Sequence, residues 1–330
     1  MKNEKLYFIS WIRAFSTICI VLCHLCSSSS IGWIIPFGQV FNIGVQIFFL
    51  ISAFCFGYQG NIINVKEWYL KRLRRIICPY WIFLLIIYGV YFVTNQKISY
   101  INLLSCMFFL QGMHAGILGA DHTWFMTTLI ICYILTPIIS KLWIKVIAKR
   151  KQKKAYIMIL IMPIIMALVL KEAIFFIIYH IFFYSIAYGI GYQWKKLEYK
   201  IGNSKIYLFC ILLLCCFRVL ARTIFDGTKL YEWIIVNYVY YFTAGCIFIL
   251  FVLYFSNIKP IKIVQKIDLI SFEIYLYHYM FVVGPVSLMQ ITKNWIINSV
   301  VVICVTVLIA MILHEISKKV LQYVCGSIQL

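Results

Sequence analysis

Apolar runs long enough to cross a membrane recur along the whole chain, and they limit the fold more than any other feature. A helix of about 20 apolar residues crosses the hydrocarbon core of a bilayer. Ten such runs are predicted, with approximate edges, at residues 8–27, 39–58, 77–95, 123–143, 156–170, 173–193, 206–222, 233–255, 270–290 and 295–316. Because only short segments connect them, the sequence predicts an all-α, polytopic transmembrane helical bundle that forms a single domain over residues 1–330.

One further apolar stretch, residues 101–118, is interrupted by Gly112 and Gly116. We interpret it as a re-entrant or interfacial segment rather than an eleventh span. The composition agrees with a membrane protein, because 64% of the residues are apolar and the mean hydropathy is +0.95. A soluble domain is closer to about half apolar and about a quarter charged.

The positive charges lie between the apolar runs instead of forming one basic region. The net charge is +20. If the N-terminus is cytoplasmic, the inner segments hold 22 Lys and Arg, mostly in the loops 59–76, 144–155, 194–205 and 256–269, whereas the outer segments hold 5. The positive-inside rule then places both termini in the cytoplasm. We interpret the charge as a topology signal, expect no nucleic-acid partner, and expect a multi-pass protein of the inner or plasma membrane.

The cysteines do not form a disulfide framework or a metal site in this interpretation. Cys19, Cys23 and Cys26 fall at i, i+4 and i+7 of the first run. A structural zinc site usually takes four ligands from paired motifs, and the second pair is missing, so no metal is predicted. No cleavable signal peptide is predicted either, because Arg13 interrupts the charged start and the first run lacks a small-residue cleavage site.

The first apolar run carries two ionisable residues, Arg13 and His24. Eleven helical steps return to within about 20° of the starting direction, so both side chains are predicted on one helix face, separated by about 16 Å along the axis. Ionisable groups at membrane depth are costly, which favours a functional site. Two alternatives stay open: Arg13 reaches lipid head groups, and His24 is a hydrogen-bonded packing residue.

Four further stretches extend this pattern. They are Phe48 to Ala53, Lys71 to Trp81, His122 to Phe125 and Ser271 to His278. In this order and spacing they resemble the membrane acyltransferase-3 family, whose members acylate cell-envelope glycans. The resemblance covers most of the chain, from Arg13 to about His278.

Three signatures of that family match residues of this sequence. Its Arg, ten residues, His signature matches Arg13 and His24, and its Arg-x-x-Arg signature matches Arg72 and Arg75. Its Phe-Phe-x-x-Ser-Gly signature matches Phe48, Phe49 and Ser52, but Ala53 stands where glycine is expected.

The resemblance implies transfer of an acyl group, expected to be acetyl, from cytoplasmic acyl-CoA to a hydroxyl of an envelope or extracellular polysaccharide. His24 would be the general base or a transient acyl carrier, because histidine titrates near neutral pH. Arg13 would orient the donor. Arg72 and Arg75 would hold the phosphates of acyl-CoA, with anionic lipid as the alternative partner. The remaining residues assigned to the donor side are Phe48, Phe49 and Ser52.

Polar residues of two other runs are candidate contacts for the glycan acceptor. They are Glu273, Tyr275 and His278 in the ninth run, with His122 and Trp124 at the predicted outer mouth. The alternatives are that Glu273 and His278 bind each other or neighbouring helices, and that Trp124 is an interfacial anchor. His180, Arg218 and His314 are interpreted as packing residues or helix-end groups.

Two other functions compete with acyl transfer. The first is a transporter or flippase for a glycan or lipid intermediate, with Arg13 and His24 in the transport path. The second is a non-catalytic subunit of a polysaccharide synthesis complex.

Overall fold

The structure is a computed structural model that describes residues 6–113, 116–194 and 202–325. Within these residues it is helical and contains no strand, which confirms the all-α class. The first helices are α1 (Tyr7–Ser27), α2 (Ile35–Phe41), α3 (Gly44–Gln59), α4 (Val65–Val93), α5 (Tyr100–Met107), α6 (Trp124–Ala148) and α7 (Gln152–Val169). The others are α8 (Glu172–Gln193), α9 (Ser204–Phe225), α10 (Val236–Phe255), α11 (Lys262–Leu269), α12 (Ser271–Val282) and α13 (Trp295–Cys325). A 3₁₀ turn, η1 (Asp121–Thr123), precedes α6, and a π-helical turn, η2 (Leu230–Ile235), precedes α10.

Nine helical segments of the described residues are long and apolar enough to cross a membrane. They match nine of the ten predicted runs, and the protein is therefore a multi-pass membrane protein. Residues 1–5 and most of the predicted inner loop 194–205 lie outside the described residues. The cytoplasmic placement of the termini stays a prediction.

The ninth predicted run, residues 270–290, was wrong in its extent. The helix there, α12, has 12 residues, and at 1.5 Å per residue it is about 18 Å long, well short of the hydrocarbon core. The apolar sequence continues past its end, but Val283 is extended and Gly284 has a φ of 141°. Pro285 follows and disfavours a helical conformation at the residue before it. The apolar sequence therefore extends beyond the last residue of the helix.

The predicted inner loop 59–76 is helical from Val65 onward. Asn64 caps α4, because its side-chain oxygen accepts a hydrogen bond from the Glu67 backbone N–H at 3.1 Å. Such a cap satisfies a backbone donor that the first turn leaves without a partner. Glu67 also pairs with Lys71 at 2.6 Å one turn later. Arg72 and Arg75 thus lie in the N-terminal part of a 29-residue helix.

The stretch 101–118 does not span a membrane as a helix, because α5 has only eight residues. Side chains bind backbone carbonyls at both ends of the segment that follows α5. The Tyr80 hydroxyl donates to the Cys106 carbonyl at 3.0 Å, and the Gln111 amide donates to the Thr123 carbonyl at 2.7 Å. Non-helical backbone at membrane depth requires such partners within the protein. These bonds agree with the interpretation of a non-spanning segment.

The chain divides into two compact units, each assembled from separate stretches of sequence. The first unit comprises residues 1–16, 43–63 and 134–265, and the second comprises residues 17–42, 64–133 and 266–330. The division falls inside α1, α6 and α11, so neither unit is a continuous piece of sequence. A single domain over residues 1–330 stays a prediction.

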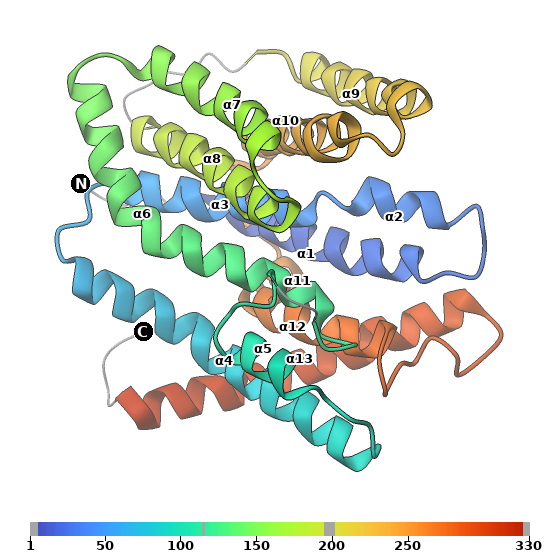
Figure 1. Ribbon diagram of the computed structural model, residues 1–330. Helices are drawn as coiled ribbons and strands as arrows, with labels where there is room; N and C mark the ends of the chain where they lie inside the picture. The colour runs from blue at the N-terminus through green and yellow to red at the C-terminus, as the bar shows by residue number, and fades with distance from the viewer. Residues whose placement is uncertain (1–5, 114–115, 195–201, 326–330) are drawn as a thin grey trace. The chain divides into compact units, whose positions relative to one another are not determined.

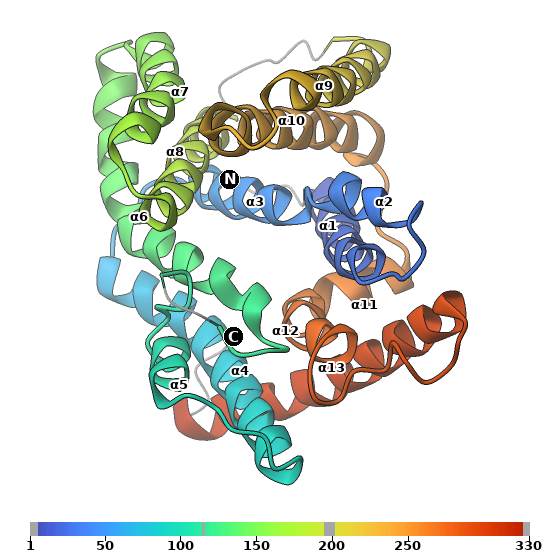
Figure 2. The same cartoon turned by 45° about the vertical axis from the view of Figure 1, so that its right-hand side comes forward.

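Close helix pairs build each unit (Figures 1 and 2). In the first unit α3 packs along α8, and α9 runs beside α10. The glycines Gly57 and Gly191 allow the contact between α3 and α8, since a Cβ at either position would lie within 2.2 Å of a carbonyl oxygen of the other helix. In the second unit α12 packs on α13 and on α4. These two contacts hold α12, which carries much of the site described next.

Candidate active site

Three histidines that are far apart in the sequence meet in the second unit. His24 lies near the end of α1, His122 in η1 and His278 in α12. The ring centroid of His278 lies 5.2 Å from that of His24 and 5.0 Å from that of His122, and the His24 and His122 centroids are 6.3 Å apart. His122 and His278 are buried, whereas His24 is half-buried. We call these three rings the imidazole cluster.

One backbone carbonyl determines which nitrogen carries a hydrogen in two rings of the imidazole cluster. The carbonyl oxygen of Tyr275 lies 2.9 Å from His122 Nε2 and 2.8 Å from His278 Nδ1. A carbonyl only accepts hydrogen bonds, so each of these nitrogens carries a hydrogen. The other nitrogens, His122 Nδ1 and His278 Nε2, are buried and have no partner among the described residues. In the neutral rings they bear lone pairs, so two buried proton acceptors lie beside His24.

Tyr275 also clamps η1 through its side chain. Its hydroxyl donates to the backbone carbonyl of His122 at 2.7 Å, which makes the contact between the two residues reciprocal. The ring of Tyr279, one turn further along α12, lies 4.6 Å from the His24 ring and 5.0 Å from the His122 ring. Both tyrosines therefore belong to the surroundings of the imidazole cluster.

Glu273 lies on another side of α12 and pairs with a different helix. Its carboxylate is buried and its Oε1 lies 2.9 Å from Nδ1 of His314 on α13. Five helical steps separate Glu273 from His278, which places their side chains about 140° apart. This spacing explains why Glu273 binds His314 instead of His278, the partner considered from the sequence. His314, interpreted above as a packing or helix-end residue, has a specific ionisable partner.

The remaining acceptor candidate, Trp124, follows η1 directly. It is the first residue of α6 and 36% of its surface is exposed. The glycan role of Trp124 stays a prediction.

The donor-side arginines Arg72 and Arg75 lie on α4 in the second unit. Three helical steps place them about 60° apart on the helix, so both project from one side. Arg72 is half-buried and Arg75 is exposed. Two guanidinium groups in this arrangement suit a multiply charged phosphate ligand.

The other motif residues belong to the first unit. Arg13 is half-buried on the uninterrupted helix α1, eleven residues before His24, as predicted. Phe48 and Ser52 are half-buried on α3, and Phe49 is fully buried. The Phe49 ring lies 4.6 Å from the imidazole of His180, which is hydrogen-bonded through Nδ1 to the hydroxyl of Tyr241.

Residues 6–315 match the family Acyl_transf_3, described as an acyltransferase domain. The chain belongs to this acyltransferase family. The match covers nearly the whole chain, including all three histidines of the imidazole cluster, and supports a membrane acyltransferase. Comparisons with curated proteins and with solved structures gave no match.

The site of this acyltransferase includes features that the sequence alone did not join. His24, His122 and His278 were each singled out, but their meeting depends on contacts across as many as 254 residues of sequence. His314 was missed as the partner of Glu273. The general rule that a carboxylate inside a membrane protein needs a partner could have indicated His314. Among the residues described, no group of three or more His, Cys, Asp or Glu is arranged to hold a metal ion.

Proposed function

We propose that this acyltransferase transfers an acetyl group from cytoplasmic acyl-CoA to a hydroxyl of an envelope or extracellular polysaccharide, with His24 as the general base. The imidazole cluster carries the proposal. His122 and His278 are buried and tied to the Tyr275 carbonyl, whereas His24 is half-buried and its ring has no hydrogen bond among the described residues. His24 is therefore the ring of the three that a substrate can reach.

The proposed reaction needs no group beyond the two substrates and a base. The acceptor oxygen attacks the thioester carbonyl carbon while a nitrogen of His24 takes the hydroxyl proton. The tetrahedral intermediate then loses the thiolate of CoA by cleavage of the C–S bond, and the His24 imidazolium returns the proton to the sulfur. The products are an ester and free CoA.

The donor side of the proposal uses the arginines. Arg72 and Arg75 would bind the phosphates of acyl-CoA by forked hydrogen bonds. Arg13 would orient the thioester end of the donor or balance its charge. The family resemblance also assigns Phe48, Phe49 and Ser52 to the donor, and their part in binding acyl-CoA stays a prediction.

The proposal is tested with labelled acetyl-CoA and membrane vesicles that contain the host polysaccharide. Loss of a general base lowers the rate by about 10²–10⁴-fold, so His24→Ala is expected to lose transfer by at least about 100-fold. Cys23→Ala, a half-buried neighbour on the same helix, is the control and is expected to retain activity. Transfer by His24→Ala at the control rate would refute the catalytic assignment.

The donor site is tested separately. Arg75→Ala is expected to raise the KM for acetyl-CoA about tenfold or more, because a charged hydrogen bond contributes roughly 1.5–3 kcal/mol. Arg74→Ala, on the same turn but outside the motif, is the control. A transporter or a non-catalytic subunit would release no CoA in either variant or in the unaltered protein.

A further inference from the structure

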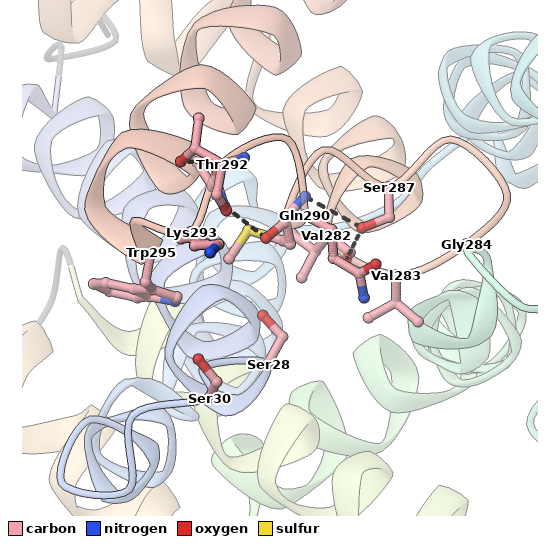
Figure 3. Close-up of a pocket in the computed structure, with 12 residues that line it drawn as sticks. Ser28, Ser30, Val282, Val283, Gly284, Ser287, Gln290, Thr292, Lys293 and Trp295 are labelled. Atoms are coloured by element: carbon pink, nitrogen blue, oxygen red, sulfur yellow. Dashed lines mark hydrogen bonds between the residues drawn. The ribbon is translucent and has the colours of Figure 1, made fainter.

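A polar pocket opens beside the imidazole cluster at the ends of α1 and α12. It lies in the second unit, between the residues that follow α1 and the loop 283–294 that joins α12 to α13, and has a volume of about 640 Å³. Figure 3 shows Ser28 and Ser30 on one side of this pocket, facing Gln290 and Thr292 of the loop on the other. The volume falls in the range of roughly 300–1,000 Å³ that small-ligand sites occupy.

Each histidine of the cluster lies close in the chain to a wall of this pocket. Ser28 follows His24 by one turn, and its backbone N–H donates to the His24 carbonyl at 3.0 Å. Val282 follows His278 by one turn of α12. Four residues of helix rise about 6 Å, so both pocket residues lie about that far along the helix axes from the histidines. The pocket wall therefore lies about one helical turn beyond His24 and His278.

The loop that carries His122 also touches the pocket. Gly119 lies three residues before His122 and approaches Gly284 so closely that a Cβ at Gly284 would lie 3.2 Å from the Gly119 Cα. Both residues have positive φ, 87° and 141°, which favours glycine at each position. The segment that holds His122 is thus in contact with the pocket wall.

The pocket loop is held by a buried amide. The Asn298 side chain donates to the carbonyls of Met289 and Thr292 at 2.7 and 2.8 Å, and its oxygen accepts from the Thr292 backbone N–H and hydroxyl. Trp295 fixes the loop to α1, because its indole N–H donates to the Leu25 carbonyl at 3.2 Å. A site with such supports is pre-organised, which lowers the entropy lost when a ligand binds.

The groups left for a ligand are those that bind sugars. The side chains of Gln290 and Lys293 and the hydroxyl of Ser30 make no hydrogen bond among the described residues, and all three are exposed. The half-buried Trp295 presents its ring beside them. Amides and hydroxyls match sugar hydroxyls, and an indole packs on the apolar face of a sugar. The described lining holds one cation, Lys293, and no acidic residue, which favours a neutral or anionic sugar.

We propose that this pocket binds the sugar residue of the acceptor glycan and presents its hydroxyl to His24. The inference rests on the proposed function and adds a location for the acceptor. It differs from the candidates taken from the sequence, because Glu273 and Tyr275 are buried and their polar groups already bind within the protein.

The experiment compares two acceptors in the same vesicles. One is the host polysaccharide, and the other is methanol in large excess, a small alcohol that needs no sugar site. Labelled acetyl-CoA is the donor, and the ratio of polysaccharide ester to methyl acetate is measured. Gln290→Ala and Trp295→Phe are the variants. Gln290→Ala removes no hydrogen bond of the pocket loop, whereas Trp295→Phe also removes the bond to the Leu25 carbonyl. Trp33→Phe, an exposed tryptophan outside the pocket, is the control.

We expect Gln290→Ala and Trp295→Phe each to lower this ratio at least fivefold relative to Trp33→Phe, through a higher apparent KM for the polysaccharide. Equal ratios in all three variants would overturn the assignment of the pocket while leaving the proposed function intact. A complete protein that forms neither ester would overturn both the proposed function and the pocket. The His24→Ala variant, expected to lose both esters together, distinguishes a loss of chemistry from a loss of acceptor binding.

Discussion

Alanine at Gly191 should destabilise the contact between α3 and α8 by an amount that the structure sets. A Cβ there would lie 2.2 Å from the Phe54 carbonyl oxygen, whereas ordinary contact begins at 3.4 Å, so the two atoms overlap by 1.2 Å. The obstacle is backbone, which cannot rotate away as a side chain does. Overpacking of this kind costs about 1–3 kcal/mol. We expect the free energy of unfolding of Gly191→Ala to fall by that amount, and that of Gly57→Ala, which meets the Tyr188 carbonyl at 2.1 Å, to fall similarly.

The assay is equilibrium unfolding in mixed micelles, followed by tryptophan fluorescence. The matched control is Gly245→Ala in α10, where an added Cβ meets nothing within 4 Å. Because alanine is the better helix former, the control is expected to be neutral or more stable by roughly 0.5–1 kcal/mol. If Gly191→Ala and Gly245→Ala unfold at the same denaturant concentration, the close contact of α3 and α8 is not what requires the glycine.

Three further predictions concern the second unit. Tyr275→Phe removes the donor to the buried His122 carbonyl and should lower the free energy of unfolding by about 1–3 kcal/mol. We expect it to lower kcat and to leave the KM for acetyl-CoA unchanged. Unchanged kinetics would show that His122 does not need the hydrogen bond from Tyr275. His314→Leu leaves the buried Glu273 carboxylate without its partner and should destabilise the protein more than the double change Glu273→Gln with His314→Leu does, which thermal unfolding of the two variants compares. Asn64→Ala should cost about 1 kcal/mol and raise amide hydrogen exchange in residues 65–68 of α4, whereas exchange near Pro79 should stay as it was.

Hydropathy predicts most of this fold because membrane-spanning length is a direct property of sequence. It failed where apolar residues and helix ends do not coincide. Pro285 and Gly284 end α12 inside an apolar stretch, and Asn64 starts α4 inside a charged one. In both places a local backbone signal decided the helix boundary, and hydropathy does not include such signals.

The candidate site was predictable residue by residue but not as a cluster. Arg13 and His24 lie on one unbroken helix, so helical geometry alone relates them, and α1 has the predicted form. The approach of His122 and His278 depends on how η1 and α12 pack, which no local pattern encodes. The same limit applies to Glu273 and His314, which are 41 residues apart. The loop 283–294 could not be predicted as part of a site, because its polar residues do not match a known motif.

The Tyr275 carbonyl oxygen, which accepts hydrogen bonds from His122 and His278, does not depend on the side chain at position 275. Any amino acid at position 275 still supplies that oxygen, so exchanging one side chain for another cannot delete it. The orientation of His278 is therefore insulated from most missense changes at this position. Only a change that bends or rotates α12, such as a proline within it, would turn the oxygen away. Such a change would take this partner from both rings at once and leave His278 Nδ1 the Ile274 carbonyl at 3.1 Å.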